Sequence, residues 1–205
     1  APIAENLAAA LIKLTPWRGD RILVDPFCGS GTFPIEAAMM AANMAPGMNR
    51  SFTAQAWKHL APEAKWRAAF EEAGQQVKMD AYTDIQGYDI DDFQKRAVSE
   101  LSHSGKYGFL ITNPPYGERV EEKENLPGIY GTLGERFKTL DSWSMYLITA
   151  YESTENVMGL KAAKNRKIYN GMMKTYFYQF PGPKPERGSC PKPERGPCLK
   201  PERKG

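Results

Sequence analysis

The chain has 205 residues, of which 41% are hydrophobic, and a formal net charge of +3. This length suits one globular domain with a tail, and so small a charge does not by itself indicate a nucleic-acid partner. The three cysteines lack the spacing of metal ligands, so neither a metal site nor a disulfide framework is expected. No apolar run approaches the roughly 18 residues that cross a bilayer, and the N-terminus does not resemble a signal peptide. We therefore expect a cytoplasmic protein that contacts no membrane.

The first 45 residues are predicted to form a helix, a strand and a second helix. Residues 3–14 carry apolar side chains at helical spacing, namely Ile3, Leu7, Leu11 and Leu14. Residues 21–25 are predicted to form a buried strand, and a glycine-containing turn separates it from a helix over about 33–45.

This turn has the chemistry of a nucleotide site. Gly29 and Gly31 let the backbone approach a ligand closely, and the helix N-terminus supplies N–H groups and a partial positive charge. A dinucleotide fingerprint would have a third glycine at position 34, where Pro34 stands, so an NAD site is disfavoured. No Gly-Lys-Ser/Thr tripeptide follows, which excludes a P-loop.

An acidic segment, GYDID, follows at residues 87–91. An acidic residue at the end of the second strand of a nucleotide-binding sheet can accept hydrogen bonds from both ribose hydroxyls, and Asp89 is the candidate. A solvated acidic turn is the alternative.

The most informative segment is Asn113-Pro114-Pro115-Tyr116, directly after the apolar run of residues 109–112. The run predicts a buried strand, and the prolines prevent its continuation as helix or ladder. An amide, proline carbonyls and an aromatic ring at a strand end suit a planar base with an exocyclic amine. An ordinary Asn-Pro turn remains the alternative for this segment taken alone.

Taken together, DPFCGSGT at residues 25–32, GYDID and NPPY resemble the S-adenosylmethionine-dependent amino-methyltransferases. This resemblance implies a Rossmann-like α/β fold with a mostly parallel sheet and an antiparallel C-terminal hairpin. It implies S-adenosylmethionine as the cofactor, held by Asp25, Gly29, Gly31 and Asp89. It also implies that Asn113, Pro114 and Tyr116 surround the acceptor amine, with the Asn113 oxygen and the Pro114 carbonyl accepting its hydrogens.

Three further blocks narrow the resemblance. NPPYGER (113–119), FKTLDSWSMYLIT (137–149) and KNRKIYNGMMKTYFYQF (164–180) are similar to the bacterial THUMP-associated guanine-N2 RNA methyltransferases, a group that includes the large-subunit rRNA enzyme. The likeness covers about residues 1–180 and implies rRNA or tRNA as the partner. That family carries an RNA-binding THUMP module ahead of the catalytic domain. None is found in this sequence, whose abrupt start at Ala1 is most simply that of a truncated chain.

The spacing between Asp89 and Asn113 is short for this fold. The 23 intervening residues have room for one helix and one strand, whereas a doubly wound sheet would place two helices and two strands there. We expect a chain break or disorder between about residues 90 and 106. Asp92 would then mark the end of the third strand and accept a hydrogen bond from the adenine amino group. A continuous helix over 92–104 is the alternative.

Downstream, the sequence predicts helices over about 61–76 and 129–140, a buried strand over 145–151, and a hairpin within 164–180 that turns at Asn-Gly. A basic cluster coincides with the hairpin and could hold RNA phosphates, although a solvated basic turn is equally consistent; its members are Lys161, Lys164, Arg166 and Lys167. Lys-Pro-Glu-Arg repeats follow, so the methyltransferase domain is assigned to 1–181 and a disordered tail to 182–205.

The predicted function is methyl transfer to the exocyclic N2 of guanine in RNA, without a metal. Guanine N2 lies in the minor groove of a duplex, so the base must be unpaired or flipped out, with Tyr116 as its stacking surface. Two alternatives stay open: an adenine-N6 or cytosine-N4 nucleic-acid methyltransferase, and a non-catalytic RNA-binding module with the same fold. The sequence makes no prediction of oligomeric state.

Overall fold

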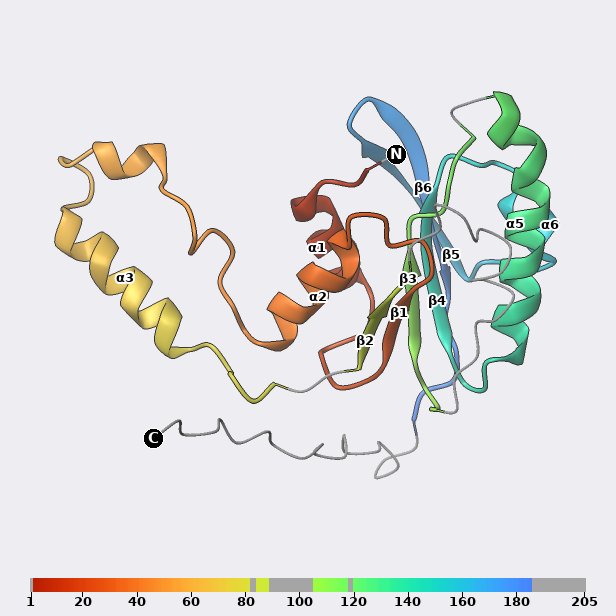
Figure 1. Ribbon diagram of the computed structural model, residues 1–205, viewed down its shortest axis with the longest axis horizontal. Helices are drawn as coiled ribbons and strands as arrows, with labels where there is room; N and C mark the ends of the chain where they lie inside the picture. The colour runs from red at the N-terminus through yellow and green to blue at the C-terminus, as the bar shows by residue number, and fades with distance from the viewer. Residues whose placement is uncertain (1, 82–83, 89–104, 118–119, 186–205) are drawn as a thin grey trace, which may run out of the picture.

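The computed structural model describes residues 2–81, 84–88, 105–117 and 120–185. Within these ranges six strands form one sheet in the order β2-β1-β3-β4-β6-β5 (Figure 1). The parallel strands are β1 (Leu23–Asp25), β2 (Ile85–Gly87), β3 (Phe109–Thr112) and β4 (Ser144–Thr149). The last two, β5 (Lys164–Asn170) and β6 (Met173–Phe180), are antiparallel to each other, and β6 is antiparallel to β4. The predicted mostly parallel α/β sheet with an antiparallel C-terminal hairpin is confirmed.

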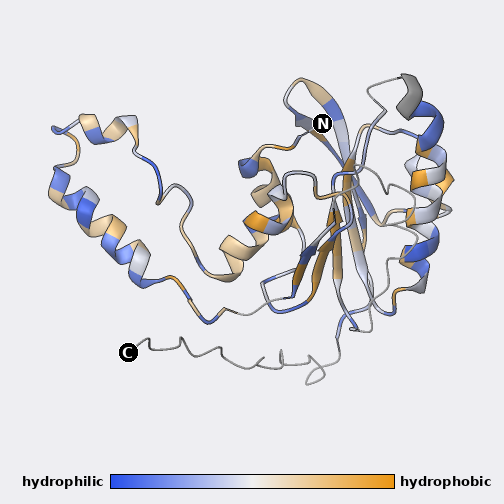
Figure 2. Cartoon of the chain, in the orientation of Figure 1, coloured by the Kyte–Doolittle hydropathy of each residue, from blue (hydrophilic) through white to orange (hydrophobic). Residues whose placement is uncertain are grey.

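Helices cover both faces of this sheet (Figure 1). On one face, α1 (Glu5–Leu14) and α2 (Thr32–Ala41) bury a cluster that includes Leu11, Phe33 and Phe177. On the other face, α5 (Val120–Thr139) and α6 (Thr154–Met158) pack over a second cluster that includes Tyr130 and Tyr178. Because β1, β3 and β4 lie between these layers, all their residues are buried and most are apolar, and Figure 2 shows them as the hydrophobic centre of the molecule.

Several predicted boundaries are corrected by the structure. The buried face of α1 differs from the predicted one at the end of the helix. Leu14 was predicted to lie on the apolar face but is 44% exposed, whereas Ala8 and Ile12 are buried. The helix predicted from residue 129 begins at Val120 and runs through Pro127. Leu126 and Ile129 are both buried on it, so the apolar face continues across the proline.

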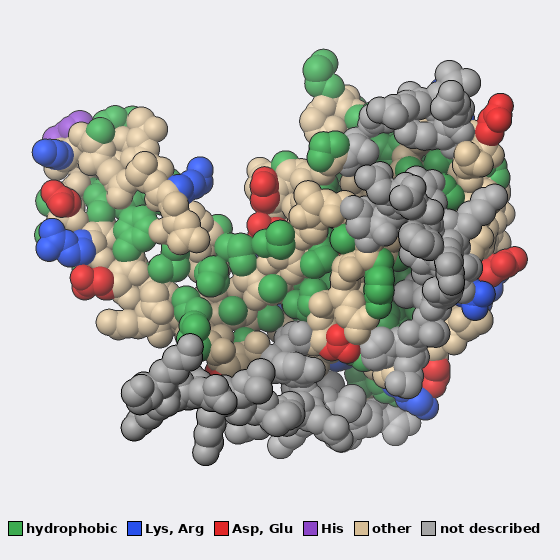
Figure 3. All heavy atoms as spheres, in the orientation of Figure 1, with side chains coloured by type: hydrophobic (Ala, Val, Ile, Leu, Met, Phe, Trp, Pro, Cys, Tyr) green, Lys and Arg blue, Asp and Glu red, His purple; other side chains and the backbone are tan. Residues whose placement is uncertain are grey.

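A helical arm lies between α2 and β2. It contains a 3-10 helix, η1 (Thr53–Ala56), and α3 (Glu63–Gln75), and it projects away from the sheet (Figure 1). The Phe52 ring stacks on Trp66 at a centroid distance of 5.9 Å and contacts Phe70 at 6.4 Å. No residue of α3 is buried, and charged side chains of both signs cover the outer side of the arm in Figure 3. These aromatics pack against one another and form a local cluster outside the main core.

The domain division at residue 181 stays a prediction, because most of the predicted tail lies outside the described residues. The predicted break in the chain falls mainly on residues 89–104, which are also outside them. Among the described strands, β2 is paired on one side only, with β1.

Candidate nucleotide and acceptor site

The carboxyl ends of β1, β2 and β3 meet at one edge of the sheet, because the three strands are parallel. The glycine turn (residues 26–31) leaves β1 at this edge, and the NPPY loop (residues 113–116) leaves β3 beside it. Sequence-predicted residues separated by more than 80 positions are therefore brought together.

The glycine turn depends on left-handed backbone conformations. Gly29 has φ +49° and Gly31, the N-cap of α2, has φ +79°, values that side chains disfavour. Among the described residues, no atom would lie within 4 Å of a Cβ at Gly29, so none of them fills that side of the turn. None of their side chains caps α2, which leaves its first N–H groups directed out of the helix end. An open turn with an uncapped helix start has the donors needed to bind an anionic or carboxylate-bearing ligand.

Asp25 joins the two halves of the site. Its Oδ1 accepts a hydrogen bond of 2.6 Å from the Thr112 hydroxyl, the residue directly before Asn113, and another of 3.0 Å from the backbone N–H of Phe27. The side chain is 1% exposed. Burial raises the pKa of Asp25 from 3.8 to about 7, although both hydrogen bonds oppose the rise. The last residue of β1 is thus a buried carboxyl poised to change charge near neutral pH.

The NPPY loop is fixed by its own side chains. The Tyr116 hydroxyl donates a hydrogen bond to Oδ1 of Asn113, which orients the amide. Tyr116 is 8% exposed, and Asn113 is partly exposed at the strand end. Gly117 then turns the chain with φ +76°, where a Cβ would come within 2.8 Å of the Leu126 side chain on α5. The ring predicted to stack on a base is therefore packed inside the loop in this structure.

A relay of hydrogen bonds from α5 and the end of β4 also supports the NPPY loop. The backbone N–H of Tyr151 donates to Oγ1 of Thr149 at 3.0 Å, and that hydroxyl lies 2.5 Å from the Tyr130 hydroxyl. Tyr130 in turn donates to the Pro115 carbonyl at 3.1 Å. Each hydroxyl donates once if Thr149 donates to Tyr130, so the relay is fully satisfied. Burial raises the pKa of Tyr130, which keeps it a neutral donor.

The second strand lies against the glycine turn. The N–H of Tyr88 donates to the Asp25 carbonyl at 2.9 Å, and the N–H of Cys28 donates to the Tyr88 carbonyl at 3.0 Å. A Cβ at Gly87 would lie 3.1 Å from the Cys28 sulfur, so the Cys28 side chain packs against the end of β2. Asp89, the candidate ribose acceptor, and Asp92, the candidate adenine acceptor, lie outside the described residues.

The basic residues predicted to hold phosphates do not form one cluster. Successive residues of a strand point to opposite faces of the sheet. Arg166 is paired with Phe177, which faces α1 and α2, and Lys164 shares that face. Lys167 is paired with Tyr176 on the face of α5 and α6. The grouping of Lys164, Arg166 and Lys167 as one phosphate site therefore needs correction.

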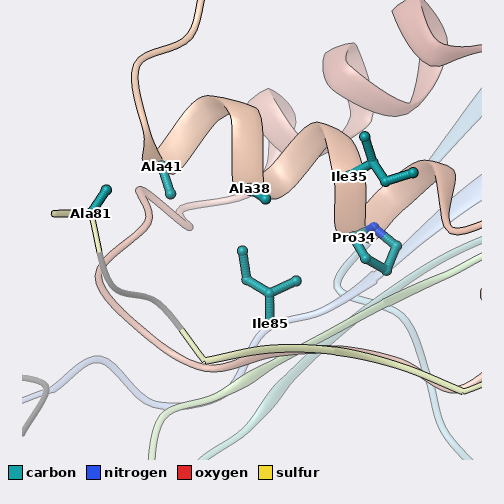
Figure 4. Close-up of a pocket in the computed structure, with 6 residues that line it drawn as sticks. All are labelled: Pro34, Ile35, Ala38, Ala41, Ala81 and Ile85. Atoms are coloured by element: carbon teal, nitrogen blue, oxygen red, sulfur yellow. The ribbon is translucent and has the colours of Figure 1, made fainter. Parts of the chain in front are cut away.

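An apolar cavity of about 350 Å³ lies between α2 and β2 (Figure 4). All of its lining side chains are apolar, namely Pro34, Ile35, Ala38, Ala41, Ala81 and Ile85. None of these side chains offers a polar group that could orient a charged ligand. Among the described residues no helix is long and apolar enough to cross a membrane, and no group of three or more acidic, His or Cys residues could hold a metal.

Sequence reasoning did not identify Thr112, Thr149 and Tyr130 as parts of the site. The Tyr130 ring is buried on α5. The hydroxyl partners come from strands and a helix that only the fold brings together. The one available signal was the threonine that ends each of the apolar runs of β3 and β4, because a polar group buried at a strand end needs a hydrogen-bond partner.

Comparison with known proteins identifies the type of domain. A family model described as "RMKL-like, methyltransferase domain" matches residues 1–179. "Putative RNA methyltransferase YpsC" of Bacillus subtilis (strain 168) is 39% identical over 200 residues, which are 88% of this chain and 52% of that protein. "Ribosomal RNA large subunit methyltransferase K/L" of Syntrophotalea carbinolica (strain DSM 2380 / NBRC 103641 / GraBd1) is 33% identical over 216 residues, covering 88% of this chain and 30% of that protein.

Two solved structures share the fold at the same level of identity. SMU.472 complexed with SAH is 39% identical with a TM-score of 0.82, over 90% of this chain and 54% of that one. A "predicted N6-adenine-specific DNA methylase" from Listeria monocytogenes str. 4b F2365 is 39% identical with a TM-score of 0.80, over 89% of this chain and 52% of that one. The chain spans about half of YpsC and under a third of the K/L protein.

Proposed function

Because the chain belongs to the family of RMKL-like methyltransferase domains, which use S-adenosylmethionine, we propose that it methylates the exocyclic N2 of guanine in RNA, and in rRNA first of all. The relatives named for RNA and rRNA support the substrate class. The guanine-N2 position rests on the resemblance of the NPPYGER and C-terminal blocks.

The observation that carries this proposal is the hydrogen bond between Asp25, which precedes the glycine turn, and Thr112, which precedes the NPPY loop. A methyl transfer is an in-line displacement, so the enzyme must hold donor and acceptor in one fixed geometry. The 2.6 Å hydrogen bond between these side chains ties the cofactor turn to the residue before Asn113. A rigid connection of this kind is what such a reaction requires.

The described residues fit the cofactor. The open glycine turn and the uncapped N-terminus of α2 suit its carboxylate, and the buried Asp25 adds a carboxyl beside that turn. We expect Asp89 to accept from the ribose hydroxyls and Asp92 from the adenine amine, as the resemblance implies. When bound, S-adenosylmethionine supplies an electrophilic methyl group on a sulfonium.

Asn113 and Pro114 are proposed to act on the acceptor. The guanine amine is a weak nucleophile because its lone pair is delocalised into the ring. The Tyr116 hydroxyl orients the Asn113 amide, and the amide oxygen would accept one amine hydrogen of the base. The Pro114 carbonyl would accept the second hydrogen, which favours a pyramidal nitrogen. Tyr116 thus positions Asn113, and its predicted stacking on the base would require the buried ring to turn outward.

Adenine-N6 or cytosine-N4 methylation is the second candidate. NPPY is shared with such enzymes, and one structural neighbour is described as a predicted N6-adenine-specific DNA methylase. Guanine-N2, adenine-N6 and cytosine-N4 methylation all place the methyl group on an exocyclic amine. The identity of the methylated nucleoside therefore discriminates between them.

The test is nucleoside mass spectrometry of rRNA from cells of the source organism that lack the gene. We expect loss of N2-methylguanosine at a defined position, restored by the wild-type gene and not by Asn113→Ala. Loss of N6-methyladenosine or N4-methylcytosine instead would establish the second candidate. No change in any RNA or DNA nucleoside, together with no binding of S-adenosylhomocysteine by calorimetry, would indicate a non-catalytic module.

A further inference from the structure

The β5–β6 hairpin extends past the end of β4. Residues 176–180 of β6 pair with Met145–Thr149 of β4, whereas the hairpin continues to Asn170 and Met173. Three residues of strand correspond to about 10 Å. Since β4 is parallel to β3, this overhang lies at the edge of the sheet that carries the NPPY loop (Figure 1). The hairpin tip therefore lies on the same side of the sheet as the NPPY loop, and Met172 at the tip is 100% exposed.

One face of the hairpin, at the end of β4 and beyond it, alternates tyrosine and lysine. Lys167 is paired with Tyr176, and Tyr169 with Lys174, so these four side chains share the face of α5 and α6. We call them the Tyr–Lys face. The Lys167 ammonium lies 5.3 Å from the Tyr169 ring centre, and the Lys174 ammonium lies 5.1 Å from that of Tyr176. Tyr169 is 55% exposed.

This arrangement has the two elements of single-stranded nucleic-acid recognition. Aromatic faces stack on bases, and lysines beside them neutralise phosphates. A hydrogen bond with the Tyr176 hydroxyl raises the pKa of Lys174, so it stays charged at neutral pH. Glu152 lies near enough to contribute to that rise, so the surface is not uniformly positive and aromatic contact must supply part of the binding.

We propose that the Tyr–Lys face binds the single-stranded RNA next to the target base. Two strand spacings, from β3 through β4 to β6, separate it from the NPPY loop, which is about 10 Å. That separation suits a neighbouring nucleotide of the same strand. The inference rests on the proposed function for its RNA substrate, but not for the identity of the methylated atom.

The opposite face of the same hairpin provides a matched control. Lys164 and Arg166 are exposed, belong to β5 and point toward the α1 and α2 side. Replacing both removes the same charge as replacing Lys167 and Lys174. A general attraction between RNA and a basic hairpin would make the two double variants equivalent.

The experiment measures fluorescence anisotropy of a labelled 12-nucleotide RNA made only of adenine and cytosine. We expect Lys167→Ala/Lys174→Ala to bind about tenfold more weakly, with a salt slope smaller by about 0.7 per lysine. Tyr169→Ala should also lose about tenfold, and Tyr169→Phe, which keeps the ring, should bind like the wild type. Lys164→Ala/Arg166→Ala should change affinity less than twofold. Thermal unfolding of each variant checks that the hairpin is intact.

Equal losses in the two double variants, or no loss in either, would overturn the inference. So would failure of the wild type to bind the probe, or equal affinity for a duplex of the same sequence. Methylation assays separate this inference from the proposed function. If the Tyr–Lys variants bind RNA and methylate guanine like the wild type, RNA binding by the Tyr–Lys face is rejected and the proposed function stands. Hairpin-dependent RNA binding with a methylated nucleoside other than guanosine would reject the guanine assignment alone.

Discussion

The turn after β1 and the loop after β3 follow short buried strands at the same edge of the sheet, but they are held by different means. The glycine turn relies on backbone conformation, with Gly29 and Gly31 at positive φ and open space around Gly29. The NPPY loop relies on side chains, because Tyr116 holds Asn113 and Tyr130 holds the Pro115 carbonyl. The open glycine turn suits a large ligand. The NPPY loop, which is fixed by side-chain hydrogen bonds, suits the alignment of one small amine.

The difference predicts how each region fails. Substitutions in the NPPY loop should lower the rate with little effect on cofactor binding. Substitutions in the glycine turn should weaken cofactor binding. The Asp25–Thr112 hydrogen bond connects the two regions, so changes there should reach both.

The largest expected effect is that of Asn113→Ala on the rate. Loss of one oriented partner of the reacting amine should slow single-turnover methylation of guanine-containing RNA a hundredfold or more, on the order of 3 kcal/mol. Affinity for S-adenosylhomocysteine, measured by calorimetry, should be unchanged. Full activity of the variant would show that NPPY is only a turn, and the guanine-N2 assignment would fall with it.

Asp25 should make stability depend on pH. Its pKa in the folded protein, about 7, lies above the ordinary value of 3.8, so the folded state holds the proton more tightly than the unfolded state. The contribution is complete below about pH 4 and is lost as pH rises through about 7. Between pH 5 and 8 the free energy of unfolding should fall by roughly 2–3 kcal/mol, measured by denaturant titration.

Two variants sharpen this prediction. Asp25→Asn, which cannot ionise, should flatten the profile over the same range. Thr112→Val removes a hydrogen bond that lowers the Asp25 pKa, so it should move the midpoint to higher pH. Identical profiles for wild type and Asp25→Asn would mean that Asp25 does not titrate in this range.

Gly29→Ala and Gly171→Ala form a matched pair. Both glycines have positive φ, +49° and +61°, and at neither would a Cβ lie within 4 Å of another atom of the described residues. Each substitution should therefore cost about 1–2 kcal/mol of stability through backbone strain alone. Only Gly29→Ala should also weaken binding of S-adenosylhomocysteine, by about tenfold, because only that turn is proposed to contact the cofactor. Equal binding by the two variants would remove the glycine turn from the cofactor site.

Tyr130→Phe should have the smallest effect. It removes the donor to the Pro115 carbonyl and leaves the ring packed against Tyr151. The lost hydrogen bond should cost about 1 kcal/mol, or about fivefold in methylation rate, with cofactor affinity preserved. Tyr151→Phe is the control, because the Tyr151 group in the relay is its backbone N–H. Equal rates for Tyr130→Phe and wild type would show that the relay only stabilises the fold.

Much of the fold could be predicted because its signals are local. A run such as FLIT followed by Asn-Pro-Pro defines a buried strand and its end, and glycines at 29 and 31 mark a turn with positive φ. The Asn-Gly pair correctly placed the hairpin turn between β5 and β6. The helix predicted from residue 129 begins earlier and contains Pro127, because packing of Leu126 and Ile129 on the core outweighs the local preference of proline.

The sequence by itself determined which chemical groups stand at the strand ends, because short-range patterns specify strands and turns. Only the tertiary structure decided that these ends share one edge, through parallel pairing, and which partners each group has. Asp25 and Thr112 are 87 residues apart, and Tyr130 reaches the Pro115 carbonyl from a helix on one face of the sheet. Strand alternation could have separated Lys167 from Lys164 and Arg166, but which face each side chain occupies depends on the pairing of β5 with β6. Contacts between distant residues depend on topology, which local spacing does not specify.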